Sequence, residues 1–138
     1  MLLSMNEGER FRLTQQERIR GEKRIETLFT HGSSFMAYPF RVVWLKGETR
    51  ATTSVSLLVS IPKKRLKRAV DRNRMKRLTR EAYRLHKQSL TGVMAACKGR
   101  LDVALVYVKD EPGDFVTVEK GVVRAIRELG RTIQKTDE

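Results

Sequence analysis

The sequence is poor in the residues that build metal centres, disulfides and catalytic triads. Cys97 is the only cysteine among 138 residues, which excludes an internal disulfide and a thiolate cluster around zinc. We expect Cys97 to pack as a small buried apolar side chain. His31 and His86 lie far apart, with no carboxylate or cysteine at ligand spacing. The sequence therefore predicts no metal site and no catalytic residue of its own.

Long apolar runs are also missing. The run over residues 101–108 is far shorter than the roughly 20 residues that a membrane-spanning helix needs. The amino-terminal residues 1–12 contain Glu7 and Glu9 and lack the apolar core of a secretory signal. We therefore expect a cytoplasmic protein with no membrane partner.

Acidic residues are scarce relative to basic ones. Sixteen aspartates and glutamates face 29 lysines and arginines, which gives a net charge of +13 and a pI near 10.5. Without a polyanionic partner this charge would only repel itself, so nucleic acid is the expected partner. Hydrophobic residues make up 40% of the chain, enough for one folded domain. We expect a single domain over residues 1–138, with an ordered core at about residues 11–133.

Three segments have apolar residues at the spacing of an amphipathic helix. The first, residues 15–30, begins with the capping-box pattern Thr14-Gln15-Gln16-Glu17. The second, residues 69–87, has an acidic residue in its first turn, and the third covers residues 118–133. In the second helix the predicted packing stripe consists of Met75, Leu78, Ala82 and Leu85.

Runs of β-branched and aromatic residues predict three strands. Residues 39–46 and 51–61 flank a turn, so we expect them to pair as an antiparallel hairpin, with a further short strand in or beside residues 51–61. The apolar run over residues 101–108 is typical of a strand covered on both faces. Helices packed on a small sheet, an α+β two-layer sandwich, account best for this order of elements.

Positive charge is concentrated between Lys63 and Lys87. Twelve lysines and arginines, less Asp71 and Glu81, leave +10 on these 25 residues. A solvated helix face usually mixes both signs, so this excess favours polyanion binding over solubility alone. Helical geometry places Arg72, Lys76, Arg80 and Lys87 away from the apolar stripe. The candidate RNA-binding residues are Lys63, Lys64, Arg65, Lys67, Arg68, Arg72, Asn73, Arg74, Lys76, Arg77 and Arg80.

The same segment contains a recognisable order of motifs. A Lys63-Lys64 pair is followed by Ala69-Val70, then Arg72-Asn73-Arg74, then Lys76-Arg77 and Arg80-Glu81. This order resembles the signature of the bacterial ribonuclease P protein component, and the similarity extends over about residues 11–133. The chain departs from the family in two respects. Leu66 stands where glycine is frequent, in a spacer before Ala69 that is one residue longer, and Ile25 and Val43 stand where many members carry aromatic residues.

The resemblance implies a more specific fold than the residues alone predict. It implies a small mixed four-stranded sheet with about three helices, a ribosomal protein S5 domain 2-like arrangement. It also implies a left-handed βαβ crossover in which the basic helix connects two parallel strands, whereas the general rule favours right-handed crossovers.

The resemblance also implies an endoribonuclease subunit whose chemistry is carried by RNA. In the family, a catalytic RNA with bound Mg²⁺ removes the 5′ leader of precursor tRNA, and the protein binds both RNAs; no protein partner is implied. The leader groove between the first helix and the sheet would include Ile25, Phe29, Phe40 and Val43, where Phe29 and Phe40 either stack on the leader or fill the core. Two alternatives stay open, a ribosomal or RNA-chaperone protein without a processing role and a DNA-binding module.

Overall fold

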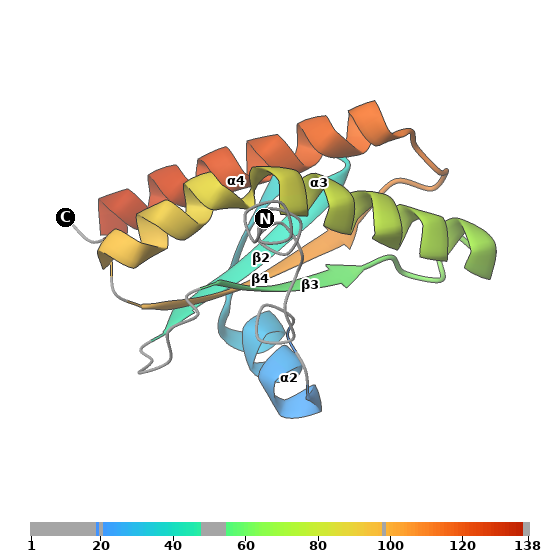
Figure 1. Cartoon of the computed structure of the whole chain (residues 1–138). Helices are drawn as coiled ribbons and strands as arrows, with labels where there is room; N and C mark the ends of the chain where they lie inside the picture. Colours follow the sequence, from blue (N-terminus) through green and yellow to red (C-terminus); the bar gives the residue numbers. More distant parts are fainter. Residues whose placement is uncertain (1–18, 20, 48–54, 98, 137–138) are drawn as a thin grey trace, which may run out of the picture.

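The computed structural model of the protein describes residues 19, 21–47, 55–97 and 99–136. The described part contains three helices and four strands, in which α3 and α4 lie side by side on one face of the sheet and α2 lies on the other (Figure 1). In chain order the elements are α2 (Glu22–His31), β1 (Ser33–Ala37), β2 (Phe40–Gly47), β3 (Val55–Ser60), α3 (Ala69–Cys97), β4 (Arg100–Tyr107) and α4 (Phe115–Thr136). The predicted α+β class with a mixed four-stranded sheet and about three helices is confirmed, and α2 adds a helix on the second face, beyond the two predicted layers.

The strand order is β1-β2-β4-β3, which makes the prediction of a hairpin between residues 39–46 and 51–61 wrong. Strand β4 lies between β2 and β3, antiparallel to the former and parallel to the latter. Six of the eight residues of β4 are buried. Its central position, with a neighbouring strand on each side, removes most of the apolar surface of β4 from water. Helix α3 joins the parallel pair β3 and β4, as the resemblance implied, while the left-handed sense of this crossover stays a prediction.

The additional strand is β1, which precedes β2 instead of lying in or beside residues 51–61. It pairs antiparallel with β2, from Ser33 opposite Trp44 to Ala37 opposite Phe40. Most of its side chains are exposed, as befits an edge strand, so its sequence carries little of the apolar alternation that reveals strands.

The helical layer packs on the face of the sheet that presents Phe40, Val42 and Tyr107. Helix α3 continues ten residues beyond the expected end at Lys87, because further apolar residues extend its buried side. That side is rotated from the predicted stripe: Leu85 is 43% exposed, and Lys87, expected to face solvent, is buried. The buried residues of α3 are Met75, Thr79, Ala82, Tyr83, Lys87, Leu90 and Met94.

Helix α2 covers part of the opposite face through the buried cluster Ile19, Leu28, Val43 and Ala104. Arg24 of α2 donates two hydrogen bonds to the buried carboxylate of Asp102 in β4, from Nη2 to Oδ1 at 2.7 Å and from Nε to Oδ2 at 3.1 Å. The helix begins at Glu22, after Gly21 with φ of 92°, and ends where Gly32 N–H donates to the Leu28 carbonyl. The predicted capping box at residues 14–17 lies outside the described residues, as does the side chain of Cys97.

Candidate nucleic-acid interface

The eleven basic and amide residues predicted to bind RNA lie together, in the loop after β3 and the first three turns of α3. None of their side chains is buried, and seven are exposed to solvent. Because β3 and β4 are parallel, this loop lies at the edge of the sheet where both strands end. We call these eleven residues the basic surface.

The loop of the basic surface has a defined internal structure. The Pro62 carbonyl accepts hydrogen bonds from the N–H groups of Arg65 at 3.0 Å and Leu66 at 3.2 Å. Leu66 is buried in the core, which anchors the loop at the position where the family often has glycine. Arg72 Nη1 donates to the carbonyls of Leu66 at 2.9 Å and Lys67 at 2.8 Å. Arg72 therefore fastens the loop to α3, and its replacement would disturb loop geometry as well as charge.

Most cations of the basic surface are not neutralised within the described part of the protein. Arg65 meets Asp110 at 3.0 Å and Arg68 meets Asp71 at 4.0 Å, in partly exposed positions where an ion pair contributes little to stability. Six further cations form no ion pair with any described residue: Lys63, Lys64, Lys67, Arg74, Lys76 and Arg77.

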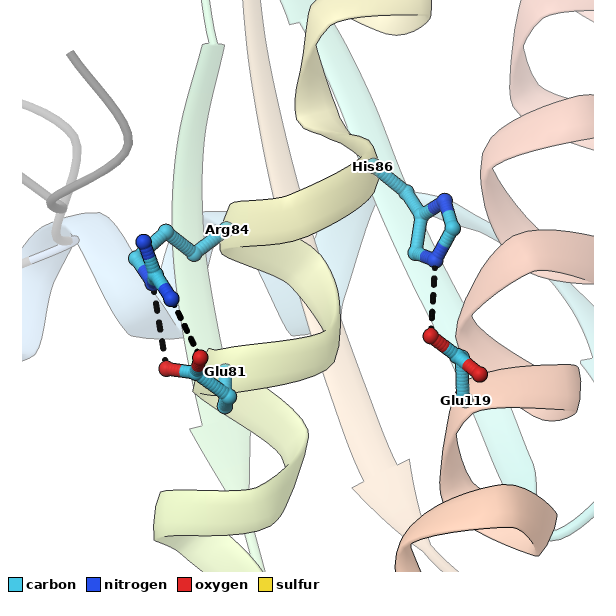
Figure 2. Close-up of polar contacts among 4 residues, drawn as sticks. All are labelled: Glu81, Arg84, His86 and Glu119. Atoms are coloured by element: carbon cyan, nitrogen blue, oxygen red, sulfur yellow. Dashed lines mark hydrogen bonds and ion pairs between the residues drawn. The ribbon is translucent and has the colours of Figure 1, made fainter. Parts of the chain in front are cut away.

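The basic surface ends at Glu81. Figure 2 shows the guanidinium of Arg84 held by both carboxylate oxygens of Glu81, on the side of α3 that faces away from α4. This hydrogen bonding lowers the pKa of Glu81 and raises the pKa of Arg84. Since Arg84 is paired and Lys87 is buried, the last two cations of the segment do not belong to a free polyanion surface.

A row of partly exposed side chains crosses the α2 face of the sheet beside the basic surface. Met36 lies opposite Arg41, Arg41 opposite Val106, and Val106 opposite Ser60, so all four share one face. Met36 is 56% exposed, Arg41 is exposed, and Val106 and Ser60 are half-buried. We call this row the open strip. Its last member, Ser60, lies three residues before Lys63 of the basic surface.

The four predicted groove residues do not lie together. Phe29 is 43% exposed and Ile25 is half-buried, and both belong to α2, which lies on the same side of the sheet as the open strip. Val43 is buried beneath α2. Phe40 lies in the core on the opposite face, edge-on to Tyr107 with ring centroids 5.8 Å apart, so its inclusion in the groove was wrong.

Sequence reasoning missed the residues of the open strip. The signal that could have found them is the two-residue alternation of β2, in which exposed Arg41 lies between buried Phe40 and Val42. Arg41 and Phe40 necessarily point to opposite faces, so they cannot line the same groove.

Within the described ranges, no three histidine, cysteine, aspartate or glutamate side chains are grouped so as to hold a metal ion. His86 instead contacts Glu119 of α4, with Nε2 at 3.0 Å from Oε2 (Figure 2). None of the helices described has the length and apolar character needed to cross a membrane.

Comparison with known proteins agrees with this geometry. The family model described as Ribonuclease P matches residues 13–130. The chain belongs to the ribonuclease P protein family. A ribonuclease P protein component of Porphyromonas gingivalis is 42% identical over 116 residues, covering 84% of this chain and 85% of the relative. That of Chlorobaculum tepidum is 35% identical over 109 residues, covering 75% and 71%.

Solved structures of ribonuclease P proteins show the same fold. The RNase P protein from Thermotoga maritima superposes with a TM-score of 0.63 at 25% identity, covering 81% of this chain and 96% of the other. The motif order between Lys63 and Glu81 therefore indicated the right family.

Proposed function

We propose that this chain is the protein subunit of a bacterial ribonuclease P, which binds the catalytic RNA and the 5′ leader of precursor tRNA and assists removal of the leader. The observation that carries the proposal is the basic surface, where six cations without an ion pair to any described residue occupy one loop and three helical turns. So many like charges in one region repel one another, and a bound polyanion would offset that repulsion.

The basic surface suits the phosphates of the catalytic RNA. Arg74 and Arg77 present exposed guanidinium groups that fit two phosphate oxygens each, and Asn73 offers a donor and an acceptor to a sugar hydroxyl or base edge. Binding would release counterions from the RNA, so the affinity should fall steeply as salt concentration rises.

The open strip suits the leader, a single strand whose bases are not paired. Met36 and Val106 provide apolar contact and Arg41 provides a cation for the backbone. The exposed ring of Phe29 adds a surface on which a base can stack, a contact worth roughly 1–3 kcal/mol and tolerant of sequence. The leader would then run from α2 across the sheet toward the basic surface.

The chemistry of cleavage belongs in this proposal to the RNA. The described residues provide no carboxylate cluster suited to Mg²⁺, so Mg²⁺ would be held by the catalytic RNA and the substrate. The protein would add positive charge where two RNA molecules approach each other, which lowers the Mg²⁺ concentration that the complex requires. Such a ribonucleoprotein would act in the cytoplasm.

Reconstitution with the ribonuclease P RNA of the same organism tests the proposal. The protein should restore cleavage of precursor tRNA at a Mg²⁺ concentration at which the RNA alone is inactive. The double variant Arg74→Ala/Arg77→Ala should weaken this rescue, while Arg84→Gln, whose arginine is already held by Glu81, should retain it. Failure of the folded protein to rescue cleavage, with recovery of ribosomal RNA alone on co-purification, would favour the ribosomal or RNA-chaperone alternative.

A further inference from the structure

Helix α4 carries a second row of cations, on the opposite side of the sheet from the open strip. Its four members recur at intervals of four, three and four residues, which places them within about 60° of each other around the helix. The apolar residues Val122, Ala125 and Leu129 occupy the other side of α4 and are buried against the sheet and α3. The row consists of Lys120, Arg124, Arg127 and Arg131.

The acidic residues of α4 are already engaged. Glu119 contacts His86 across the gap between the two helices, and Glu128 contacts Arg131 at 3.6 Å. Among the residues described, Lys120, Arg124 and Arg127 form no ion pair. A helix face that served solubility alone would carry acidic and basic side chains in alternation. Three neighbouring cations without an ion pair to a described residue therefore indicate an anionic ligand.

A hollow of about 470 Å³ lies beside these three cations. Tyr38, from the turn between β1 and β2, also lines it, and its ring is 56% exposed. Gly121 allows this arrangement: a Cβ there would lie 2.7 Å from Pro39 Cδ and 3.0 Å from the Tyr38 carbonyl oxygen. Since only glycine permits α4 to approach the turn so closely, the packing itself brings an exposed aromatic ring beside the cations.

The hollow continues along the helices. A second hollow of about 480 Å³ shares His86, Val123 and Arg127 with the first and extends past Gly130 to Gln134. The contact between His86 and Glu119 bridges α3 and α4 at this junction, as Figure 2 shows. The two hollows therefore form one groove between α3 and α4, with Tyr38 at one end and mainly cations along its α4 side, where Glu119 is the one acidic residue among those described that lines the hollows.

We propose that Tyr38, Lys120, Arg124 and Arg127 form a second RNA-binding site, separate from the basic surface and the open strip. An unpaired base stacks on Tyr38, and the phosphates beside it lie on the three cations. Single-stranded nucleic acid binds to sites in which an exposed aromatic ring is flanked by lysine and arginine. An acidic peptide would bind the cations but has no base to stack on the ring. The identity of the ligand as RNA rests on the proposed function.

With the open strip on one face of the sheet and this groove on the other, the protein would contact two separate RNA segments at once. The first face holds the leader and the second holds an unpaired segment of the catalytic RNA. Two such contacts on one small domain raise the effective concentration of each segment for the other.

Salt titrations of the affinity for the catalytic RNA test this site. The triple variant Lys120→Gln/Arg124→Gln/Arg127→Gln should reduce the magnitude of the salt slope by roughly one for each phosphate that it no longer binds. Tyr38→Ala should weaken binding roughly tenfold and Tyr38→Phe should retain it, because the ring and not the hydroxyl stacks. Arg84→Gln is the matched control, since Arg84 is held by Glu81 on the side of α3 that faces away from α4, and it should bind like the wild type.

The outcomes separate this proposal from the proposed function. If the triple variant keeps the wild-type slope while Arg74→Ala/Arg77→Ala loses affinity, the second site is wrong and the proposed function stands. If the wild-type protein does not bind the catalytic RNA, both are wrong. A benzophenone amino acid at position 38 provides an independent readout in cells: crosslinks to the catalytic RNA support the site, and crosslinks only to an acidic protein overturn it.

Discussion

The two faces of the sheet differ in how they are covered. On one face, α3 and α4 bury Phe40, Val42 and Tyr107 within the large core. On the other, α2 covers Val43 and Ala104 but leaves Met36 and Arg41 exposed. The first face supplies apolar burial, the main source of folding free energy, while the second keeps accessible the residues that we propose to hold the leader. The comparison predicts that substitutions on the two faces will separate stability from RNA binding.

The largest expected effect is on the covered face. Leu129→Ala removes a fully buried side chain of α4 and leaves a cavity, so it should lower the free energy of unfolding by about 3 kcal/mol. Chemical denaturation measures this loss. Below the unfolding transition, the affinity of the variant for the catalytic RNA should equal that of the wild type; a large loss of affinity in the folded variant would contradict the division between the faces.

A smaller loss of stability is expected where α2 is fastened to the sheet. Asp102→Asn removes the buried carboxylate to which Arg24 is bonded, and should lower the free energy of unfolding by about 2 kcal/mol. The loss is no larger because the guanidinium of Arg24 keeps partial access to water. The substitution should also weaken leader binding, since α2 loses its fixed position. Asp110→Asn, which breaks the exposed pair with Arg65, is the control and should cost less than about 1 kcal/mol. Equal losses in the two variants would show that Arg24 and Asp102 do not hold α2.

Leu28 and Phe29 are adjacent residues of α2 that differ in burial, so their substitutions should separate stability from leader binding. Phe29→Ala should change the free energy of unfolding by about 0.5 kcal/mol or less, and weaken binding of a precursor tRNA with a leader by about 1 kcal/mol. Substrate lacking the leader should bind both proteins equally. Leu28→Ala, one position earlier and fully buried, should instead lower stability by about 3 kcal/mol. An affinity for the leader that is unchanged in Phe29→Ala would remove that ring from the proposed groove.

The last effect is absent at neutral pH and appears only at alkaline pH. Burial raises the pKa of Tyr107 from 10.0 to about 12, and its hydroxyl donates to the Glu111 carbonyl at 2.8 Å. Above pH 10 the unfolded chain loses this proton while the folded protein retains it, so stability should fall as pH rises from about 10 toward about 12. Tyr107→Phe removes this contribution. Between about pH 10 and about pH 12, the denaturation midpoint of the wild type should therefore fall relative to that of the variant. Parallel pH profiles would contradict the assignment.

Local signals in the sequence predicted the presence of three helices and the placement of charge, but not where α2 begins or where α3 ends. The basic segment, α3 from Ala69 and the buried strand β4 follow from periodicity and composition. Strand pairing did not follow, because the position of β4 between β2 and β3 depends on contacts between residues far apart in the chain.

Errors within the candidate site have separate physical causes. The resemblance assigned Phe40 to the groove, but in β2 adjacent residues point to opposite faces, so Phe40 lies in the core and Arg41 on the α2 face. In α3 the buried side includes Tyr83 and Thr79, which a purely aliphatic stripe ending at Leu85 omits. The loop geometry set by Leu66 and Arg72 could not be predicted either, since it depends on backbone carbonyls that have no sequence signature.

The salt dependence of binding to the catalytic RNA tests the central claim most directly, namely that exposed cations of the basic surface contact RNA phosphates. For Arg74→Ala/Arg77→Ala, the slope of log affinity against log salt should be smaller in magnitude by roughly two than that of the wild type, with unchanged stability. A slope identical to that of the wild type in the folded variant would contradict the account.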